Sequence, residues 1–276
     1  MIPFVKTEAL GNDFILVRLG DTGSRAYSSL AQRICDRRLG VGADGLILWA
    51  EPQKSGEAFR VRIFNIDGSE AECSGNGLRC MAAYLFTRRG VGGQVCLETI
   101  SGVYALERAG DRYTADMGVP ELRPGAIPVR IPGNPERVVD FPLEVDGRIL
   151  NVTCCATGNP HCSLFVDDIE DGRVERLGPA IERHEAFPNR TNVEFVRVID
   201  RSGIEVAFWE RGAGRTPASG TGSCGAVVAS VLNDRTGRRV TVHTTNGDLL
   251  VEWLENERLR LTADATVVAE GEYLLS

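Results

Sequence analysis

The sequence predicts an α/β (α+β) protein of two homologous domains, each an antiparallel, barrel-like sheet around one central helix. Three segments of the first half recur in the same order in the second half, at a nearly constant separation of 145 to 147 residues. Each half also contains a strand, a glycine-rich turn and a helix in that order. Most other apolar runs are short and alternate with polar residues, which is the period of a half-buried strand.

The internal repeat defines the expected domains. Its matching segments are residues 9–12, 60–77 and 98–106 in the first half and residues 156–159, 205–222 and 243–251 in the second. Collinear matches at a nearly constant separation indicate a duplication. The stretch 119–135 is rich in proline and glycine, which is typical of a domain boundary. We therefore expect one domain at residues 1–119 and another at residues 120–263.

Each glycine-rich turn leads into a predicted central helix. Residues 76–89 carry apolar side chains at helical spacing and end in two arginines before Gly90, which favours a helix C-terminus there. Residues 222–234 are small and apolar almost all round, as in a helix that is buried inside a domain. Shorter helical patterns at residues 28–38 and 178–184 predict one peripheral helix in each half.

Composition excludes several classes of protein. The net charge of −7 gives no basic face for nucleic acid. No apolar run approaches the roughly 20 residues that cross a bilayer, and the first residues lack the features of a signal peptide. We therefore expect a cytoplasmic protein with no nucleic-acid or membrane partner. The eight cysteines form no CxxC pair, so we expect free thiols and no metal site.

Two turns of the same pattern, Ser-Gly-Asn-Gly at residues 74–77 and Ser-Gly-Thr-Gly at residues 219–222, are the candidate functional feature. Glycine lets the backbone turn sharply and brings bare N–H groups close to a ligand. The N-terminus of the following helix adds unpaired donors and a positive dipole end, so the expected ligand is a carboxylate or a phosphate. A structural N-cap would explain one such turn. Two at equivalent places of a duplicated chain predict a ligand site in a pseudo-two-fold cleft between the domains.

The chain resembles the diaminopimelate epimerases over essentially its full length. The resemblance is carried by GNDFILV, GVGADG, RIFNIDGSEAECSGNGLRC, GNPHC, RTNVEFV and WERGAGRTPASGTGSCGA, in family order and spacing. It implies that the final strand, within residues 264–276, returns to the first domain and that the protein is a homodimer. The implied reaction interconverts LL- and meso-diaminopimelate by inverting one α-carbon, with one base on each face and without pyridoxal phosphate, metal or other cofactor.

The resemblance also implies which residues hold each end of the substrate. Main-chain donors of the two turns would bind the α-carboxylate and help it to carry carbanion charge, namely those of Gly75, Asn76, Gly220 and Thr221, with Asn12 nearby. A second set would hold the distal ammonium and carboxylate, namely Asn65, Asn159, Asn192, Glu210 and Arg211. Arg211 is suited to a bidentate grip on a carboxylate.

The sequence departs from the family at both catalytic positions. Ser74 and Ser219 stand where the family carries the two cysteines that exchange the α-proton. Cys73 comes one residue before the first position, Cys224 comes five after the second, and Arg215 stands where a glutamate is common. A thiol has a pKa of about 8.5, which a helix N-terminus lowers. A serine hydroxyl is far less acidic and acts only with a neighbouring base.

No histidine adjoins either serine in the sequence. His161, in the GNPH segment, is expected to support the asparagine loop rather than to take part in the chemistry. Cys73 would reach the site only if the turn shifted by one residue, because side-chain direction reverses along an extended segment.

Four explanations of the two serines stay open. The chain is an engineered double Cys→Ser form that traps a ligand, a natural variant that still epimerises diaminopimelate slowly, a relative with another substrate or a single-base reaction using Glu210, or an amino-acid binding protein without turnover. The unusual residues around the turns favour natural divergence, namely Cys73, Arg215, Pro217 and Ser223. The intact distal set favours a retained diaminopimelate pocket.

Overall fold

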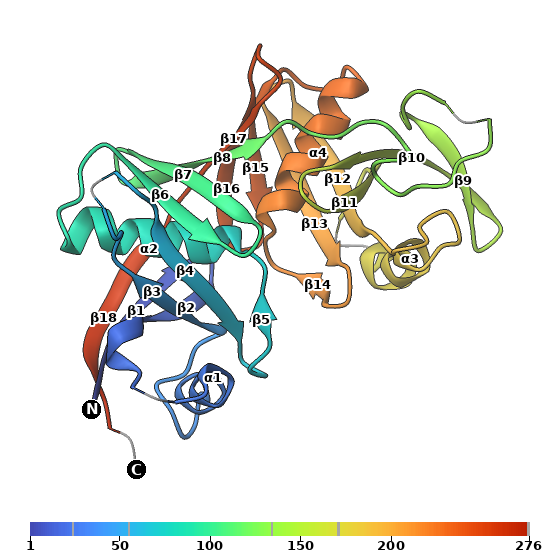
Figure 1. Cartoon of the computed structure of the whole chain (residues 1–276). Coiled ribbons are helices and arrows are strands. Elements are labelled where there is room, and N and C mark those ends of the chain that lie inside the picture. Colours follow the sequence, from blue (N-terminus) through green and yellow to red (C-terminus); the bar gives the residue numbers. More distant parts are fainter. Residues whose placement is uncertain (24, 55, 134, 170–171, 275–276) are drawn as a thin grey trace. The chain divides into compact units, whose positions relative to one another are not determined.

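The computed structural model describes residues 1–23, 25–54, 56–133, 135–169 and 172–274. The chain forms two compact units (Figure 1). Unit 1 comprises Met1–Asp116 with Thr262–Ser276, and unit 2 comprises Met117–Leu261. The described residues contain eighteen strands and four α-helices. No helix among them combines the length and the apolar character that crossing a bilayer requires.

Unit 1 contains two α-helices, α1 (Tyr27–Ile34) and α2 (Gly75–Arg88), and a short 3-10 helix at Leu19–Asp21. Its strands are β1 (Ile2–Ala9), β2 (Asn12–Arg18), β3 (Gly45–Ala50), β4 (Phe59–Asn65), β5 (Glu70–Ala71), β6 (Gln94–Thr99), β7 (Gly102–Ala109), β8 (Arg112–Gly118), which ends just past the division, and β18 (Thr266–Tyr273).

Unit 2 repeats this order of elements, with α3 (Arg173–Glu182) and α4 (Gly220–Leu232) in the places of α1 and α2. Its strands are β9 (Phe141–Val145), β10 (Arg148–Ala156), β11 (Pro160–Phe165), β12 (Asn192–Asp200), β13 (Gly203–Glu210), β14 (Gly214–Thr216), β15 (Arg239–Thr244), β16 (Gly247–Trp253) and β17 (Leu259–Ala263), which ends just past the division. The predicted fold, two homologous halves rich in β-structure around central helices, is confirmed.

The sheets are mixed rather than wholly antiparallel. In unit 1, β2 pairs in parallel with β3, and β4 with β6. In unit 2, β11 pairs in parallel with β12, and β13 with β15. Parallel neighbours need a crossover connection, usually a helix. A helix lies in each of these four connections (α1, α2, α3 and α4), so each helix forms the crossover of one parallel pair.

The last strand of the chain pairs with the first. β18 pairs antiparallel with β1, from Ile2 opposite Tyr273 to Glu8 opposite Thr266. In unit 2, β10 pairs instead with the strand directly before it, β9, in a local hairpin. Unit 1 is therefore completed by a strand from the C-terminal end of the chain.

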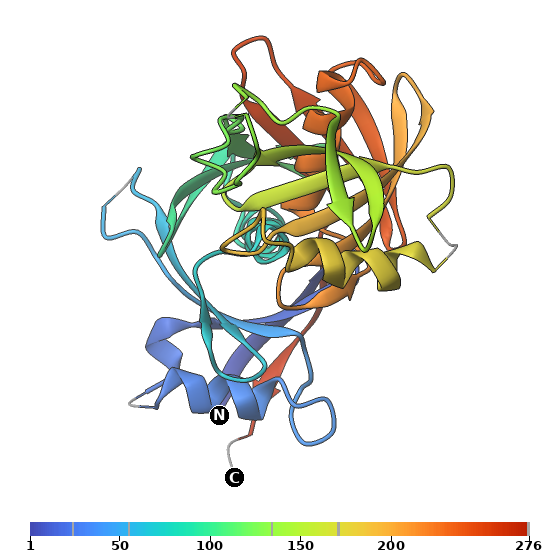
Figure 2. The ribbon, with the colours of Figure 1, turned by 90° about the vertical axis from the view of Figure 1, so that its right-hand side faces the viewer.

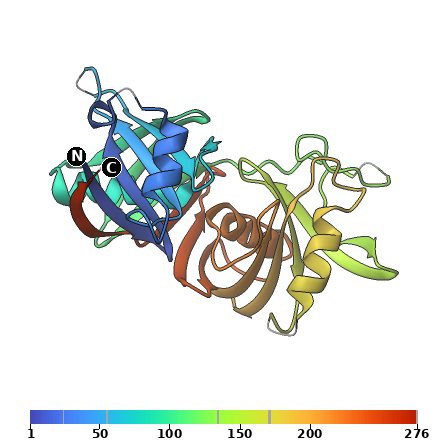
Figure 3. The same cartoon turned by 90° about the horizontal axis from the view of Figure 1, so that it is seen from below.

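Most residues of the two central helices are buried. Every residue of α4 from Gly222 to Ser230 is buried, which agrees with its apolar composition on all sides. Figure 2 looks along the axis of α2, and Figure 3 shows the strands of unit 2 curving around α4. The outer helices are amphipathic instead, and each buries one face, which in α3 is that of Val174, Leu177 and Ile181.

Both peripheral helices differ from their predicted bounds. α1 ends at Ile34, because the next residues form a turn in which the Asp36 carboxylate accepts the N–H groups of Arg38 and Leu39 at 2.7 and 2.8 Å. α3 begins five residues before Gly178. The sequence analysis starts that helix at the Gly-Pro pair, but Gly178 is needed inside the helix for close packing, since a Cβ there would lie 2.6 Å from Trp209 Cγ.

Candidate active site

Ser74 is the N-cap of α2 and the first residue of the first glycine turn. Its backbone is extended, with φ −144° and ψ 118°, and its Oγ accepts the N–H of Gly77 at 3.1 Å. Gly77 is closely packed, because a Cβ there would lie 3.2 Å from Ile47 Cδ1 and 3.3 Å from Ser74 Cβ. The first turn therefore has the geometry of a capped helix start.

Ser219 has the same role at the start of α4. Its φ and ψ are −142° and 125°, and its Oγ accepts the N–H of Gly222 at 3.2 Å. A Cβ on Gly222 would lie 2.9 Å from the ring of Phe208. Ser219 is only 8% exposed. The two turns are thus equivalent in geometry as well as in sequence.

The turns can bind anions through their main chain. The first N–H groups of an α-helix have no intrahelical acceptor, and here they belong to the predicted donors Gly75, Asn76, Gly220 and Thr221. They lie at the positive end of the helix dipole, where a carboxylate is stabilised. Among the described residues, no group of three or more His, Cys, Asp or Glu side chains could hold a metal ion.

Asn12 and Asn76 lie together in unit 1, as the predicted site requires. Asn76 Nδ2 donates to Asn12 Oδ1 at 3.2 Å, and Asn12 Nδ2 donates to Asp44 Oδ2 at 2.9 Å. The buried guanidinium of Arg79 donates to Asn76 Oδ1. These contacts fix both amide side chains to the protein, so that the main-chain donors of the turn are the groups best placed to receive an anion.

Asn65, the other predicted binding residue of unit 1, ends β4 and is exposed. Its Nδ2 donates to Ser69 Oγ at 2.9 Å, and its main chain closes a turn with Gly68 and Ser69. Within the described residues these hydrogen bonds stay inside the turn and do not reach Asn12 or Asn76, so unit 1 by itself brings together only part of the predicted set.

In unit 2, Asn192 connects two further predicted elements. Its Nδ2 donates to Pro160 O at 2.8 Å, and its Oδ1 accepts the Arg211 N–H at 2.9 Å. It is thereby buried between the turn that carries Asn159 and the turn that carries Arg211. Glu210 ends β13 directly before Arg211, and the Arg211 side chain is exposed.

The asparagine loop is also joined to the second glycine turn. Thr157 Oγ1 donates to the carbonyl oxygen of Thr221 at 3.2 Å. His161 Nε2 lies 2.8 Å from Asn159 Oδ1, which supports the expected role of this histidine in holding the loop. The other ring nitrogen, Nδ1, lies 2.6 Å from Oε1 of Glu194, a buried carboxylate that the sequence analysis did not single out.

The unusual residues near the turns have separate structural explanations. The Cys73 thiol lies against Ser101 and Tyr104 of the β6–β7 hairpin, and burial raises its pKa. It is therefore not a substitute base in a shifted turn. Cys224 is fully buried in α4. Arg215 forms an ion pair with Glu175 of α3.

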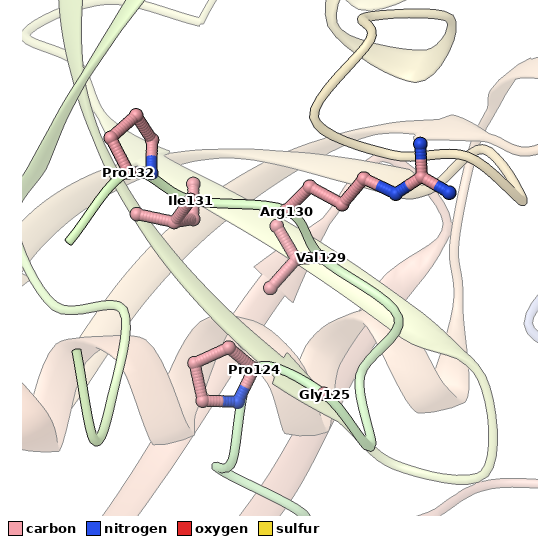
Figure 4. A pocket seen from close by; sticks show the side chains of 6 residues that line it. All are labelled: Pro124, Gly125, Val129, Arg130, Ile131 and Pro132. Carbon is pink, nitrogen blue, oxygen red and sulfur yellow. The ribbon is translucent and has the colours of Figure 1, made fainter. Parts of the chain in front are cut away.

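A surface hollow of about 510 Å³ in unit 2 is lined by Pro124, Gly125, Val129, Arg130, Ile131 and Pro132. Figure 4 shows these side chains along one loop. The hollow includes none of the predicted site residues and offers one charged group. The hollow therefore does not define the candidate active site. The two capped turns are the features that best indicate where this site lies.

The fold is that of a known class of two-domain proteins. A solved phenazine biosynthesis protein of Enterococcus faecalis superposes with a TM-score of 0.69, over 99% of each chain, at 15% identity. At this identity the likeness shows the fold alone.

Sequence comparison specifies the family. Residues 4–123 and 153–270 match the family model described as diaminopimelate epimerase. The diaminopimelate epimerase of Pelotomaculum thermopropionicum is 46% identical over 278 residues, and that of Desulfitobacterium hafniense is 46% identical over 280 residues. The alignments cover 98% of this chain and 97–98% of those proteins. The chain belongs to the diaminopimelate epimerase family.

Proposed function

We propose that this protein is a cofactor-independent isomerase that interconverts LL- and meso-diaminopimelate, a step of lysine and cell-wall precursor synthesis. We also propose that its rate of epimerisation is lower than that of a variant with cysteine at positions 74 and 219. It rests above all on the two equivalent capped turns, which belong to a chain of this family and place one hydroxyl and one set of free N–H groups in each half. The binding residues of the family are all present.

In the proposed mechanism, the N–H groups of Gly75, Asn76, Gly220 and Thr221 bind the α-carboxylate. They stabilise the negative charge that develops when the α-proton leaves, because preorganised donors are most effective where charge appears. Ser74 and Ser219 occupy the two base positions, on opposite faces of the α-carbon. One, as the rarely formed alkoxide, removes the proton and becomes a hydroxyl, and the hydroxyl of the other returns its proton and becomes the alkoxide, so that the configuration is inverted and the protons balance.

The remaining parts of the proposal concern the pocket and the assembly. Five residues hold the distal ammonium and carboxylate, namely Asn65, Asn159, Asn192, Glu210 and Arg211, with Asn12 near the α-carboxylate. We infer two domains, one of residues 1–119 with 264–276 and one of residues 120–263. The protein works in the cytoplasm as a homodimer.

Exchange of the α-proton in D₂O tests the proposal. The parent protein and a Ser74→Cys/Ser219→Cys variant are incubated with LL- and with meso-diaminopimelate, and deuterium uptake is followed by mass spectrometry. We expect slow uptake by the parent and faster uptake by the variant, because a thiolate is the more available base. A protein without either pair of bases, Ser74→Ala/Ser219→Ala, is the control for exchange that bypasses both positions.

A second function, amino-acid binding without turnover, is favoured by one observation. Both hydroxyl oxygens already accept a helix N–H, and within its own unit neither is bonded to an imidazole or a carboxylate in the part of the chain that the structure describes. Uptake by the dicysteine variant alone would support this second function. Uptake by neither form would point to a related isomerase for another amino acid.

A further inference from the structure

The turn between β13 and β14 carries two of the proposed binding residues, Glu210 and Arg211, and its main chain is bonded to buried side chains. Arg211 N donates to Asn192 Oδ1 at 2.9 Å. The next N–H group, that of Gly212, donates to Glu182 Oε1 at 3.1 Å. Arg211 and Gly212 are exposed, whereas both acceptor residues are buried. This surface turn is therefore held in place from the interior of unit 2.

The carboxylate of Glu182, the last residue of α3, also holds the residue that precedes the pair. Its second oxygen, Oε2, accepts the indole N–H of Trp209 at 2.9 Å. A single side chain thus bonds to residue 209 and to residue 212, and Glu210 and Arg211 lie between these two points of attachment. A shift of Glu182 would therefore move both ends of the segment that carries the pair.

The packing of α3 fixes the position of this carboxylate. The helix approaches β13 so closely at Gly178 that a Cβ there would lie 2.6 Å from Trp209 Cγ. Glu182 comes four residues later and lies on the same face of the helix. Its carbonyl oxygen accepts the N–H of Thr191 at 3.3 Å, which ties the end of α3 to the start of β12. Both the side chain and the main chain of Glu182 are thereby held.

The surroundings of Glu182 favour its charged form, although its side chain is only 2% exposed. Burial raises the pKa of this carboxyl, but hydrogen bonds from Trp209 and Gly212 outweigh burial and lower that pKa. The charges of Arg183 and Arg190 act in the same direction. An ionised carboxylate only accepts hydrogen bonds, so it receives both N–H groups at once. A glutamine of the same shape has one oxygen and one NH₂ group, and it can satisfy only one of them.

We propose that Glu182 is the positioning residue of this turn, and that its carboxylate keeps Glu210 and Arg211 in the geometry in which they bind diaminopimelate. Glu182 lies behind the turn and acts through it, without touching the ligand. A turn that is already fixed loses less conformational freedom when a ligand binds, and this increases affinity. The inference rests on the proposed function and deepens it, because it adds a residue of α3 to those that determine substrate affinity.

Calorimetry of meso-diaminopimelate binding tests the proposal on the full chain. The proteins compared are the parent, Glu182→Gln, Trp209→Phe and the variant with both changes, and urea unfolding of each one records any loss of stability. Glu205→Gln is the matched control, because Glu205 is on the same strand as Trp209 but accepts from Arg197 Nε at 2.6 Å, away from the turn. This control removes a carboxylate of unit 2 without changing the contacts of the turn.

We expect Glu182→Gln to weaken binding by about tenfold or more, because one N–H group next to the pair loses its charged acceptor. Glu205→Gln should leave the affinity unchanged. In the Trp209→Phe protein the glutamine oxygen can accept from Gly212, and its NH₂ group no longer faces an indole N–H. There the added Glu182→Gln change should weaken binding by less than about twofold. Equal weakening in both backgrounds, or none in Glu182→Gln alone, would overturn the proposal.

The two contacts of the carboxylate are also measured without any ligand. ¹H–¹⁵N spectra show the indole N–H of Trp209 and the amide of Gly212, and Trp209→Phe identifies the indole resonance among the three tryptophans. We expect Glu182→Gln to shift at least one of the two resonances, and two unchanged resonances would refute the proposed contacts. If neither the parent nor Ser74→Cys/Ser219→Cys binds diaminopimelate, the proposed function fails, and these spectra then decide whether Glu182 holds the turn.

Discussion

Replacing the two capping serines by cysteine should lower stability while it raises α-proton exchange. Each Oγ accepts an N–H of the first helical turn, at 3.1 Å for Ser74 and 3.2 Å for Ser219. Losing an N-cap costs about 1 kcal/mol of unfolding free energy, and sulfur is a weak acceptor. We expect a loss of about 0.5–1 kcal/mol for each Ser→Cys change. Ser219, the more buried, should show the larger effect.

Urea unfolding under reducing conditions measures this loss. With a denaturant slope of about 1–3 kcal/mol per molar, a loss of about 1 kcal/mol moves the midpoint down by roughly 0.3–1 M. Ser230→Cys is the matched control, because Ser230 is buried in the same helix as the second turn but donates to Ala226 O at 2.7 Å and caps nothing. The reasoning is refuted if the double variant unfolds at the parent's urea concentration, or if Ser230→Cys costs as much as Ser219→Cys.

Three further predictions concern stability and are all read from urea midpoints. Gly222→Ala should lower the unfolding free energy by about 1–3 kcal/mol, because the new methyl group would lie 2.9 Å from Phe208. Gly75→Ala should lower it clearly less, because the nearest atom to its methyl group lies at 3.8 Å. Equal losses in the two variants would contradict the packing argument. Burial raises the pKa of Asp13, but hydrogen bonds from an arginine and a lysine outweigh it and hold that pKa at about 2, against 3.8 unperturbed. Asp13→Asn should therefore lose about 2 kcal/mol at pH 7, a difference present above pH 4 and shrinking as the pH falls toward 2; a difference independent of pH would contradict it. Arg215→Ala should change stability by less than about 1 kcal/mol, since its ion pair is half exposed, and a larger loss would show that this departure from the family is structural.

Most of the fold could be predicted, because the duplication and the central helices leave local signals. The buried helix α4 follows from small apolar residues on all sides, and both turns follow from their glycines. The parallel pairs could not be predicted, because alternation along β2 or β11 shows that a strand exists but not which strand lies beside it. The predicted start of α3, at Gly178, is wrong, because a Gly-Pro pair usually lies at a helix end and this one lies inside the helix. Here packing against Trp209 outweighs that preference.

The sequence predicts the two glycine turns of the candidate site, but not the buried residues that pack behind them. The capping role of Ser74 and Ser219 follows from the pattern Ser-Gly-x-Gly before a helix. The direction of Cys73 toward Tyr104 depends on a distant hairpin, which no local pattern specifies. Glu194 left one usable signal. It alternates with Asn192 in the buried first half of β12, where the other residues are apolar, so a carboxylate on the inward face of the sheet could have been recognised as needing a partner.

The pairing of β18 with β1 means that the first half of the chain is not a self-sufficient folding module. A fragment ending near residue 135 carries β1 without β18, and the complementary fragment carries β18 without β1. When the two fragments are expressed together, the second supplies the strand that the first one lacks. The intact chain makes that supply permanent, because both parts then belong to one molecule.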